Sequence, residues 1–464
     1  MVFVQKKISF CVNVCMKRKI YNTLLDWKNS GQGRTALLID GARRVGKSYI
    51  VRKFAQNEYE SALFIDFGSA SPTVKKLFDD YLDDLDTLFM HLNAFYQVKL
   101  TPRKSVVVFD EVQDCPRARA AIKYLVADGR YDYIETGSLT SLQRNVKDII
   151  IPSEERHVKM YPMDFEEFLW ANGNDMLMDF IRDRYMKQQP MGALMHRKAI
   201  DLFRQYLIVG GMPQAVVAFV ETHDFGLTDR AKRDILDLYR SDIYKYATGY
   251  ESKVAAVLDL IPSQLQKHEK RFKLAALAKG ARFKDYENSF LWLNDAMIVN
   301  TCHNTTAPNV GLRMNMENTT LKCYLADTGL LVSLAFDESD IADKEIYRKL
   351  LMDKLEINQG MMVENVVAQM LRTAGHKLYF YSSASRDAEN RMEIDFLIRK
   401  PVATSRHNIS PVEVKSGKKY TTLSLQKLRA KFGQYLSTSY VIHDRDMIVT
   451  DDLVYLPYYM TPLL

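Results

Sequence analysis

The fold of the first third of this chain is decided by one stretch, Gly41-Ala42-Arg43-Arg44-Val45-Gly46-Lys47-Ser48. The stretch matches the pattern G-x-x-x-x-G-K-[ST] at every fixed position. Gly41 and Gly46 let the backbone turn tightly enough to aim its N–H groups inward. A helix that starts near Lys47 adds the positive end of its dipole at the same place. The pattern therefore predicts a loop that cradles phosphate groups.

The residues that flank this loop support the same interpretation. The apolar run from Ala36 to Ile39 predicts the strand that precedes such a loop, and Ser48 to Gln56 has the pattern of the helix that follows it. Lys47 is expected to reach the β- and γ-phosphates of ATP, and the Ser48 hydroxyl to ligate Mg²⁺. All eight residues from Gly41 to Ser48 are thus predicted to contact nucleotide, with ATP and Mg²⁺ as cofactors.

Two acids follow another apolar run, Val106 to Phe109. Asp110 is expected to hold Mg²⁺ through water, and Glu111 to activate the attacking water. The alternative for both is a solvated strand end. Thr136, after the run from Tyr131 to Glu135, is predicted to sense the γ-phosphate; Ser138 could do the same, and capping of a turn is the alternative.

Length and composition describe a globular protein of several domains. With 464 residues, 47% of them hydrophobic and 26% charged, the chain is long enough for roughly two to four domains. It contains no run of about 18 apolar residues, so we expect no membrane partner and a cytoplasmic location. Five cysteines without metal-ligand spacing fit a reducing compartment. A net charge of +7 permits binding to DNA without requiring it.

The chain divides by pattern into four parts. Residues 1–16 are expected to be a flexible extension, with Met16 as an alternative start, and residues 17–175 an α/β domain with a parallel sheet. Residues 176–340 are expected to be helical and winged-helix-like, and residues 341–464 a small α/β domain. The winged helix is predicted from four segments, two short helices and a hairpin: Lys273 to Ala278, Asp285 to Leu293, Ala296 to Cys302 and Thr320 to Leu325. A helical linker with a hairpin is the alternative.

A basic cluster surrounds the predicted winged helix and is interleaved with Phe272 and Phe283. Such a cluster can contact a phosphate backbone, which makes DNA a candidate partner, although a solvated helix face would look the same. Its members are Lys267, Lys270, Arg271, Lys273, Lys279, Arg282 and Lys284.

The last part combines acids and a lysine on predicted strands. Glu413 and Lys415 lie on one face of their strand because side chains alternate, and Glu393 and Asp395 share a face for the same reason. Together with Glu364 on the preceding helix, the order resembles the PD-(D/E)XK nuclease pattern. The resemblance implies Glu364, Asp395 and Glu413 as metal ligands, with Glu393 as the alternative to Asp395, and Lys415 as a catalytic residue. A half-exposed strand with a salt bridge from Asp395 to Lys415 is the alternative.

The order of motifs also resembles a large prokaryotic family of AAA-type ATPases that carry a C-terminal domain of unknown function. The resemblance rests on the phosphate loop, the acidic strand, Thr136-Gly137-Ser138, Pro162 to Phe168 and Gly210-Gly211-Met212-Pro213. In that family an arginine before the Pro-x-x-Phe segment commonly follows a glycine. Here Arg156 follows Glu155, so we expect a salt-bridging surface arginine rather than an arginine finger.

Two functions follow from these patterns. The first is an ATP-hydrolysing AAA-type protein that acts on or near DNA, with a restriction-endonuclease-like C-terminal domain. The second is a nucleotide-switched interaction protein whose inactive C-terminal domain binds a protein partner or a second copy of the chain. A small-molecule kinase is disfavoured because Glu111 directly follows Asp110, an arrangement that polarises water.

Overall fold

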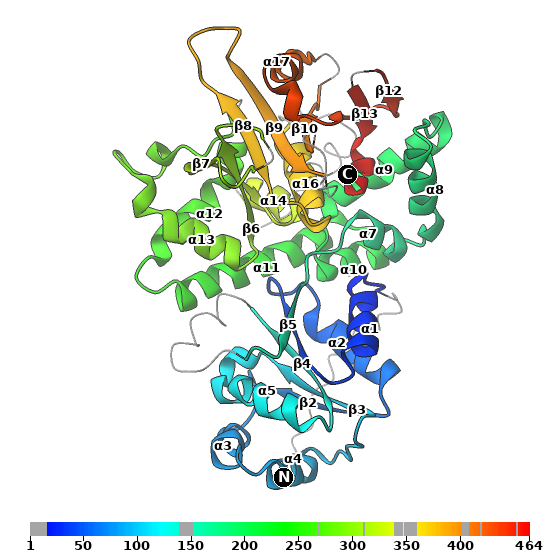
Figure 1. Ribbon diagram of the computed structural model, residues 1–464, viewed down its shortest axis with the longest axis vertical. Coiled ribbons are helices and arrows are strands. Elements are labelled where there is room, and N and C mark those ends of the chain that lie inside the picture. Colours follow the sequence, from blue (N-terminus) through cyan, green and yellow to red (C-terminus); the bar gives the residue numbers. More distant parts are fainter. Residues whose placement is uncertain are drawn as a thin grey trace.

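The computed structural model describes residues 16–138, 152–267, 269–309, 311–337, 347, 360–400, 408–417, 420–451 and 453–464. Two sheets organise these residues, with helices between them, and the long helix α11 (Phe225–Tyr246) crosses the middle of the molecule (Figure 1). The predicted extension lies outside the described residues except for Met16, which is buried.

The first sheet is parallel throughout, as predicted. Its five strands, in spatial order, are β2 (Ser61–Asp66), β3 (Ser105–Asp110), β4 (Asp132–Gly137), β1 (Ala36–Asp40) and β5 (Glu155–Lys159). The sequence did not predict β5, because its residues are mostly polar. An edge strand of this kind pairs on one side only and leaves its side chains in water.

Helices cover both faces of the first sheet, and the strand residues alternate between two cores. Leu37 and Ile39 pack with Trp27 and Phe54, whereas Leu38 belongs to the core of the opposite face. The helices that belong to this part are α1 (Ile20–Gly31), α2 (Lys47–Glu58), α3 (Pro72–Asp80), α4 (Leu85–Tyr96) and α5 (Pro116–Asp128). Burial on both faces explains the apolar runs of the inner strands β1 and β3.

The following part is mostly helical, with a break at Gly210-Gly211. Its helices are α7 (Phe165–Ala171), α8 (Asp175–Met186), α9 (Ala193–Val209), α10 (Pro213–Thr222), α11, α12 (Glu251–Leu265), α13 (Glu287–Asp295), α14 (Thr328–Ala335) and, further along the chain, α16 (Gly360–Thr373). The break has a steric reason. A Cβ on Gly211 would lie 2.0 Å from the Met163 carbonyl oxygen, and the Met163 N–H donates to the Gly211 carbonyl at 2.6 Å.

The second sheet is mixed and has eight strands. In spatial order they are β12 (Ile448–Val449), β13 (Leu453–Pro457), β11 (Ser439–His443), β10 (Ile409–Val414), β9 (Met392–Arg399), β8 (Tyr379–Ser383), β6 (Val299–Thr305) and β7 (Met316–Leu325). Helix α17 (Leu423–Phe432) packs beside β9 (Figure 1). The two strands predicted to carry Glu393 with Asp395 and Glu413 are therefore present as β9 and β10.

The β6–β7 hairpin does not form a separate unit, because β6 pairs in parallel with β8. The winged helix is not confirmed. Its second predicted helix is present as α13, but Lys273 to Ala278 contains only the 3-10 turn Leu274–Ala276. This segment is held close to β7, since the Phe272 N–H donates to the Leu321 carbonyl at 2.9 Å. The hairpin is the edge of the second sheet.

Candidate functional site

The predicted phosphate loop connects the end of β1 to the start of α2. Gly46 has a φ of 96°, a conformation that favours glycine. Gly41 is required for space, since a Cβ there would lie 2.4 Å from the Met160 carbonyl oxygen. Arg44, between them, also has a positive φ of 67°. The loop is therefore tightly turned and closely packed against the end of β5.

The Lys47 side chain is buried and bends back over the loop. Its ammonium donates to the carbonyl oxygens of Gly41 at 2.8 Å and Ala42 at 3.0 Å. Burial lowers the pKa of Lys47, against the opposing effect of nearby Glu111 and Asp110. The lysine is thus held inside the loop by neutral oxygens, which an anion with full negative charge can replace.

Four predicted residues come together beside the loop: Ser48 from α2, and Asp110, Glu111 and Thr136 from the ends of β3 and β4. The Ser48 hydroxyl donates to Asp110 Oδ1 at 2.8 Å, and the Thr136 hydroxyl donates to the same oxygen. The Glu111 N–H donates to Thr136 Oγ1 at 3.3 Å. Because β3 and β4 are parallel neighbours, their carboxyl ends meet at this edge.

Glu111 has a left-handed backbone, with a φ of 52°. This conformation is uncommon for a residue with a side chain and recurs at functional sites. The Glu111 carboxylate is half-buried and accepts a hydrogen bond from Gln113. The side chain is therefore oriented by a neighbour rather than left to rotate in water.

The helical part touches the loop from outside through residues that the sequence did not single out. Arg43 forms an ion pair with Asp242 of α11 at 2.7 Å. The Tyr239 hydroxyl, one turn earlier, donates to the Arg43 carbonyl at 3.1 Å. Nearly 200 residues separate these partners along the chain, so no local pattern could have revealed them.

Arg18 supports the loop from its other side and was also missed. Its guanidinium donates to the carbonyls of Val45 and Tyr161, both at 2.7 Å, and pairs with Glu167 at 3.1 Å. In the sequence it stands in the run Lys17-Arg18-Lys19, which has the appearance of a solvated charge run. Its burial in the structure links the phosphate loop to the Pro162–Phe168 segment.

The arginine before that segment differs from its prediction. Arg156 is exposed on the edge strand β5, and it forms no ion pair within the described parts of the chain. The neighbouring Glu155 instead pairs with Arg119 at 3.0 Å. Nothing here assigns Arg156 a role at the nucleotide site.

The second group of predicted residues lies where α16 crosses the second sheet. Glu364 is buried and contacts Lys322 at 3.2 Å, and it also accepts hydrogen bonds from Lys270 and Tyr324. Burial by itself would raise the pKa of Glu364, but the two lysines outweigh it and lower this pKa to about 2. Glu364 is therefore an ionised carboxylate that two lysines hold.

Lys322 of β7 also holds the two acids of β9. Its ammonium lies 2.9 Å from Glu393 and 3.5 Å from Asp395. The second oxygen of Asp395 accepts from the Val414 N–H at 2.9 Å. Burial, with the charge of Glu364, raises the pKa of Asp395. We call Lys322 with Glu364, Glu393 and Asp395 the carboxylate cluster.

Glu413 and Lys415 contact each other, as their alternation on one strand face predicts. The carboxylate and the ammonium are 3.0 Å apart, and burial raises the pKa of Glu413 to about 7. The alternative salt bridge from Asp395 to Lys415 is absent among the described residues, where Lys322 is the partner of Asp395.

A divalent metal does not fit the cluster as it stands. The ammonium of Lys322 occupies the position between Glu364 and Asp395 that a shared ion would need. The residues that the structure describes contain no group of three or more acids, histidines or cysteines able to hold a metal. The signal that could have warned of this is Lys322 itself, a lysine inside the apolar strand Leu321–Leu325.

The basic cluster is partly neutralised. Lys270 pairs with Glu364, Lys273 pairs with Glu269 at 2.9 Å, and Arg271 contacts the same acid. Phe272 and Phe283 pack on Phe290 rather than pointing outward as stacking platforms. The surface offered to a nucleic acid is smaller than the sequence suggests.

Comparisons with known proteins identify the N-terminal part of the chain and assign no function to the C-terminal parts. A family described as AAA domain matches residues 33–169; two domains of unknown function, DUF8612 and DUF4143, match residues 200–341 and 359–460. No curated protein matches the chain. With its parallel sheet and phosphate loop, the matched N-terminal part is an ATPase-like AAA domain.

Solved structures with a related arrangement are distant. A Walker-type ATPase of Pyrococcus abyssi is 16% identical, covers 69% of this chain and 96% of its own, and has a TM-score of 0.40. ORC1 of Aeropyrum pernix, solved in complex with DNA, is 10% identical and covers 75% of this chain and 95% of its own. Cdc6p of Pyrobaculum aerophilum is 12% identical and covers 74% of this chain and 97% of its own. Each has a TM-score of 0.27. These likenesses are too low to support an argument about function.

None of the helices in the described residues is both long enough and apolar enough to cross a membrane.

Proposed function

We propose that this chain binds ATP with Mg²⁺ and hydrolyses it at the phosphate loop of the first sheet. The observation that carries the proposal is the hydrogen-bonded group of Ser48, Thr136 and Asp110 beside the buried ammonium of Lys47. A hydroxyl and a carboxylate 2.8 Å apart are the hard oxygen donors that Mg²⁺ prefers. Ser48 and Asp110 would hold the ion, which supplies neutralisation of phosphate charge when bound.

The remaining residues have separate tasks. Lys47 would exchange the two loop carbonyls for phosphate oxygens, and Gly41 to Ser48 would present backbone N–H groups to the same anion. Glu111, oriented by Gln113, would accept a proton from the attacking water. Thr136 would report the presence of the γ-phosphate through its bonds to Asp110 and to the Glu111 N–H.

The test compares two acids of one loop. Glu111→Gln should keep ATP binding and lower the rate of hydrolysis by about a hundredfold or more, the usual scale for losing a general base. Asp114→Asn is the control, because Asp114 is exposed three residues away. Lys47→Ala should abolish tight ATP binding in calorimetry. Near-normal ATP hydrolysis by Glu111→Gln would mean that another residue is the general base.

For the C-terminal part we propose a nucleotide-switched interaction domain rather than a metal-dependent nuclease. The observation behind this choice is Lys322, whose ammonium contacts two of the three acids predicted to bind a metal, Glu364 and Asp395, while the third, Glu413, pairs with Lys415. A buried path supports communication with the first sheet: the Tyr206 hydroxyl donates to the Met163 carbonyl at 2.9 Å and accepts from Gln369 of α16 at 3.0 Å. Met163 follows the Tyr161 carbonyl that Arg18 holds.

Plasmid nicking decides between the two candidates. We expect no cleavage of supercoiled DNA by the full chain with Mg²⁺ or Mn²⁺, with or without ATP. ATP should instead change hydrogen exchange in α11 and α16, and Lys47→Ala should remove that change. Metal-dependent nicking that disappears in both Asp395→Asn and Lys415→Ala would restore the nuclease.

A further inference from the structure

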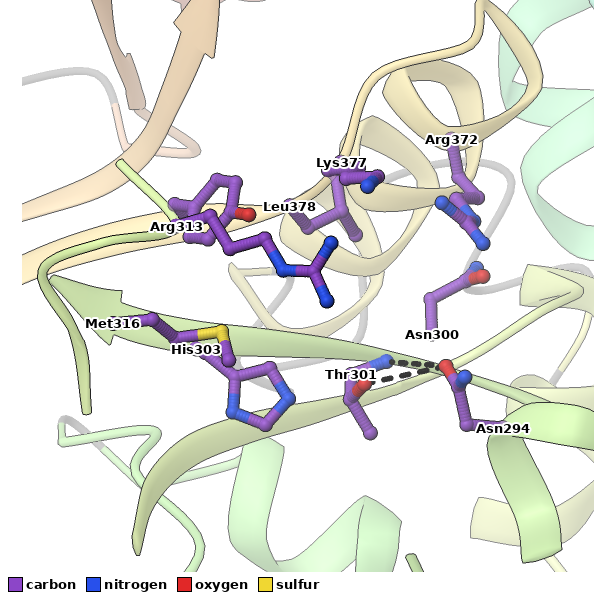
Figure 2. A pocket seen from close by; sticks show the side chains of 10 residues that line it. Asn294, Asn300, Thr301, His303, Arg313, Met316, Arg372, Lys377 and Leu378 are labelled. Carbon is purple, nitrogen blue, oxygen red and sulfur yellow. Dashed lines mark hydrogen bonds between the residues drawn. The ribbon is translucent and has the colours of Figure 1, made fainter. Parts of the chain in front are cut away.

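A pocket of about 210 Å³ opens on the second sheet, away from both sites described above. It lies where the β6–β7 hairpin meets the end of α16 and the start of β8 (Figure 2). Each of these segments contributes a cation: Arg313 from the hairpin loop, Arg372 from α16 and Lys377 from the turn before β8. No acid lines the pocket.

The three cations have no acidic partner among the residues that the structure describes. Arg313 and Lys377 are exposed at the rim of the pocket, and none of Arg313, Arg372 and Lys377 forms an ion pair with a described residue. Arg372 is only half-exposed, and Figure 2 shows its guanidinium and that of Arg313 turned toward the same hollow. Cations that converge without an acid repel one another and attract an anion.

The floor of the pocket adds uncharged hydrogen-bonding groups. Asn300 is 7% exposed, and its carboxamide has no hydrogen-bond partner among the described residues. His303 also has a buried Nδ1 without a partner, and burial lowers the pKa of this imidazole, which favours its neutral form. Buried polar atoms are normally paired, so the unpaired Nδ1 of His303 in the lining of this hollow points to a ligand.

We propose that this pocket binds a small phosphorylated anion, from pyrophosphate up to a nucleoside monophosphate. Guanidinium groups bind phosphate oxygens through two parallel hydrogen bonds, and Asn300 would complete the contact from below. A terminal phosphate carries close to two charges at neutral pH, which matches three cations better than the single charge of a backbone phosphodiester. The volume is smaller than the 300–1,000 Å³ of typical drug-sized pockets, which favours a small ligand.

Calorimetry with pyrophosphate, and separately with AMP, tests the proposal on the full chain. The phosphate loop also attracts such anions, so the titration is made in Lys47→Ala, where one saturable site should persist. Adding Arg313→Gln or Arg372→Gln should weaken that site by about tenfold to a hundredfold, the scale of a charge-assisted hydrogen bond. Arg399→Gln, an exposed arginine of the same sheet, is the matched control and should change nothing.

The same titration in the otherwise unchanged chain does not depend on the folding of Lys47→Ala. It should give two sites, and Arg313→Gln or Arg372→Gln should leave one. Three results would overturn the proposal: no site in Lys47→Ala, a site that both arginine variants leave unchanged, or binding of a single-stranded oligonucleotide without any binding of pyrophosphate or AMP.

Discussion

The nucleotide site and the carboxylate cluster use the same residue types in opposite ways. Each combines acids with a buried lysine at the surface of a sheet. Lys47 donates to neutral backbone carbonyls, so its charge is available to a phosphate. Lys322 forms ion pairs with three carboxylates, so its positive charge is already neutralised within the protein. The comparison teaches that a motif identifies a binding site only when the protein leaves its charge uncompensated.

The largest expected effect comes from removing the internal cation of the cluster. Lys322→Met should lower the free energy of unfolding by about 3–5 kcal/mol, because it removes the buried cation that contacts all three carboxylates of the cluster. Urea denaturation followed by circular dichroism measures the loss.

The double variant Lys322→Met with Glu364→Gln serves as the control. It removes a negative charge together with the positive one, and should recover part of the stability. A loss below about 1 kcal/mol in Lys322→Met would mean that the ammonium does not hold the cluster together, and the contrast between the two sites would fail.

The second prediction concerns which site responds to an added ligand. ATP with Mg²⁺ at a hundred times its Kd should stabilise the fold by about 2.7 kcal/mol, whereas Mg²⁺ or Mn²⁺ alone should leave the melting temperature unchanged. Thermal unfolding of the full chain measures both. A shift with metal alone that disappears in Asp395→Asn would show that the cluster accepts a metal after all.

The third prediction concerns the neighbour of the cluster, Glu413, whose pKa is raised to about 7. The folded state favours the protonated form, so this contribution to stability is present at low pH and is lost as pH rises from about 4.5 through 7. Glu413→Gln should therefore gain about 2–3 kcal/mol at pH 8 and almost nothing at pH 5.

Urea denaturation at several pH values measures this difference, with the exposed Glu389→Gln as the control. An equal effect of Glu413→Gln at pH 5 and pH 8 would mean that Glu413 stays ionised throughout, held by Lys415.

The smallest expected effect concerns the ion pair that joins the phosphate loop to α11. The ion pair between Arg43 and Asp242 is partly exposed, so a double-mutant cycle with alanine at both positions should give a coupling of about 0.5–1 kcal/mol. Thermal unfolding without nucleotide measures it. A coupling above about 2 kcal/mol would show that α11 clamps the loop rigidly.

The first site could be predicted because its chemistry is local in sequence. The loop from Gly41 to Ser48 is contiguous. Asp110 and Thr136 each lie at the end of a buried strand, and parallel pairing of the two strands brings them together. Strand β5 was missed because an edge strand needs few apolar residues. Arg18 and Asp242 were missed because their partners lie far away in the sequence.

The carboxylate cluster shows where such reasoning ends. Each predicted acid is present on the predicted helix or strand, and Glu413 and Lys415 share a face. The meaning of the acids depends on Lys322, which belongs to a hairpin and lies 42 residues before Glu364 in the sequence. Assigning the hairpin to a winged helix hid its pairing with β8, which no periodicity encodes.

The shared second sheet has a consequence for how this chain can be divided. The two C-terminal family matches meet between residues 341 and 359, a natural place to cut an expression fragment. A fragment beginning there would lack β6 and β7, so the edge of β8 would be open to pairing with other chains. The acids of the carboxylate cluster would also lack Lys322. We therefore expect such a fragment to aggregate. Because strands of both matched regions share one sheet, the two regions are expected to fold, and to be exchanged between proteins, as one unit.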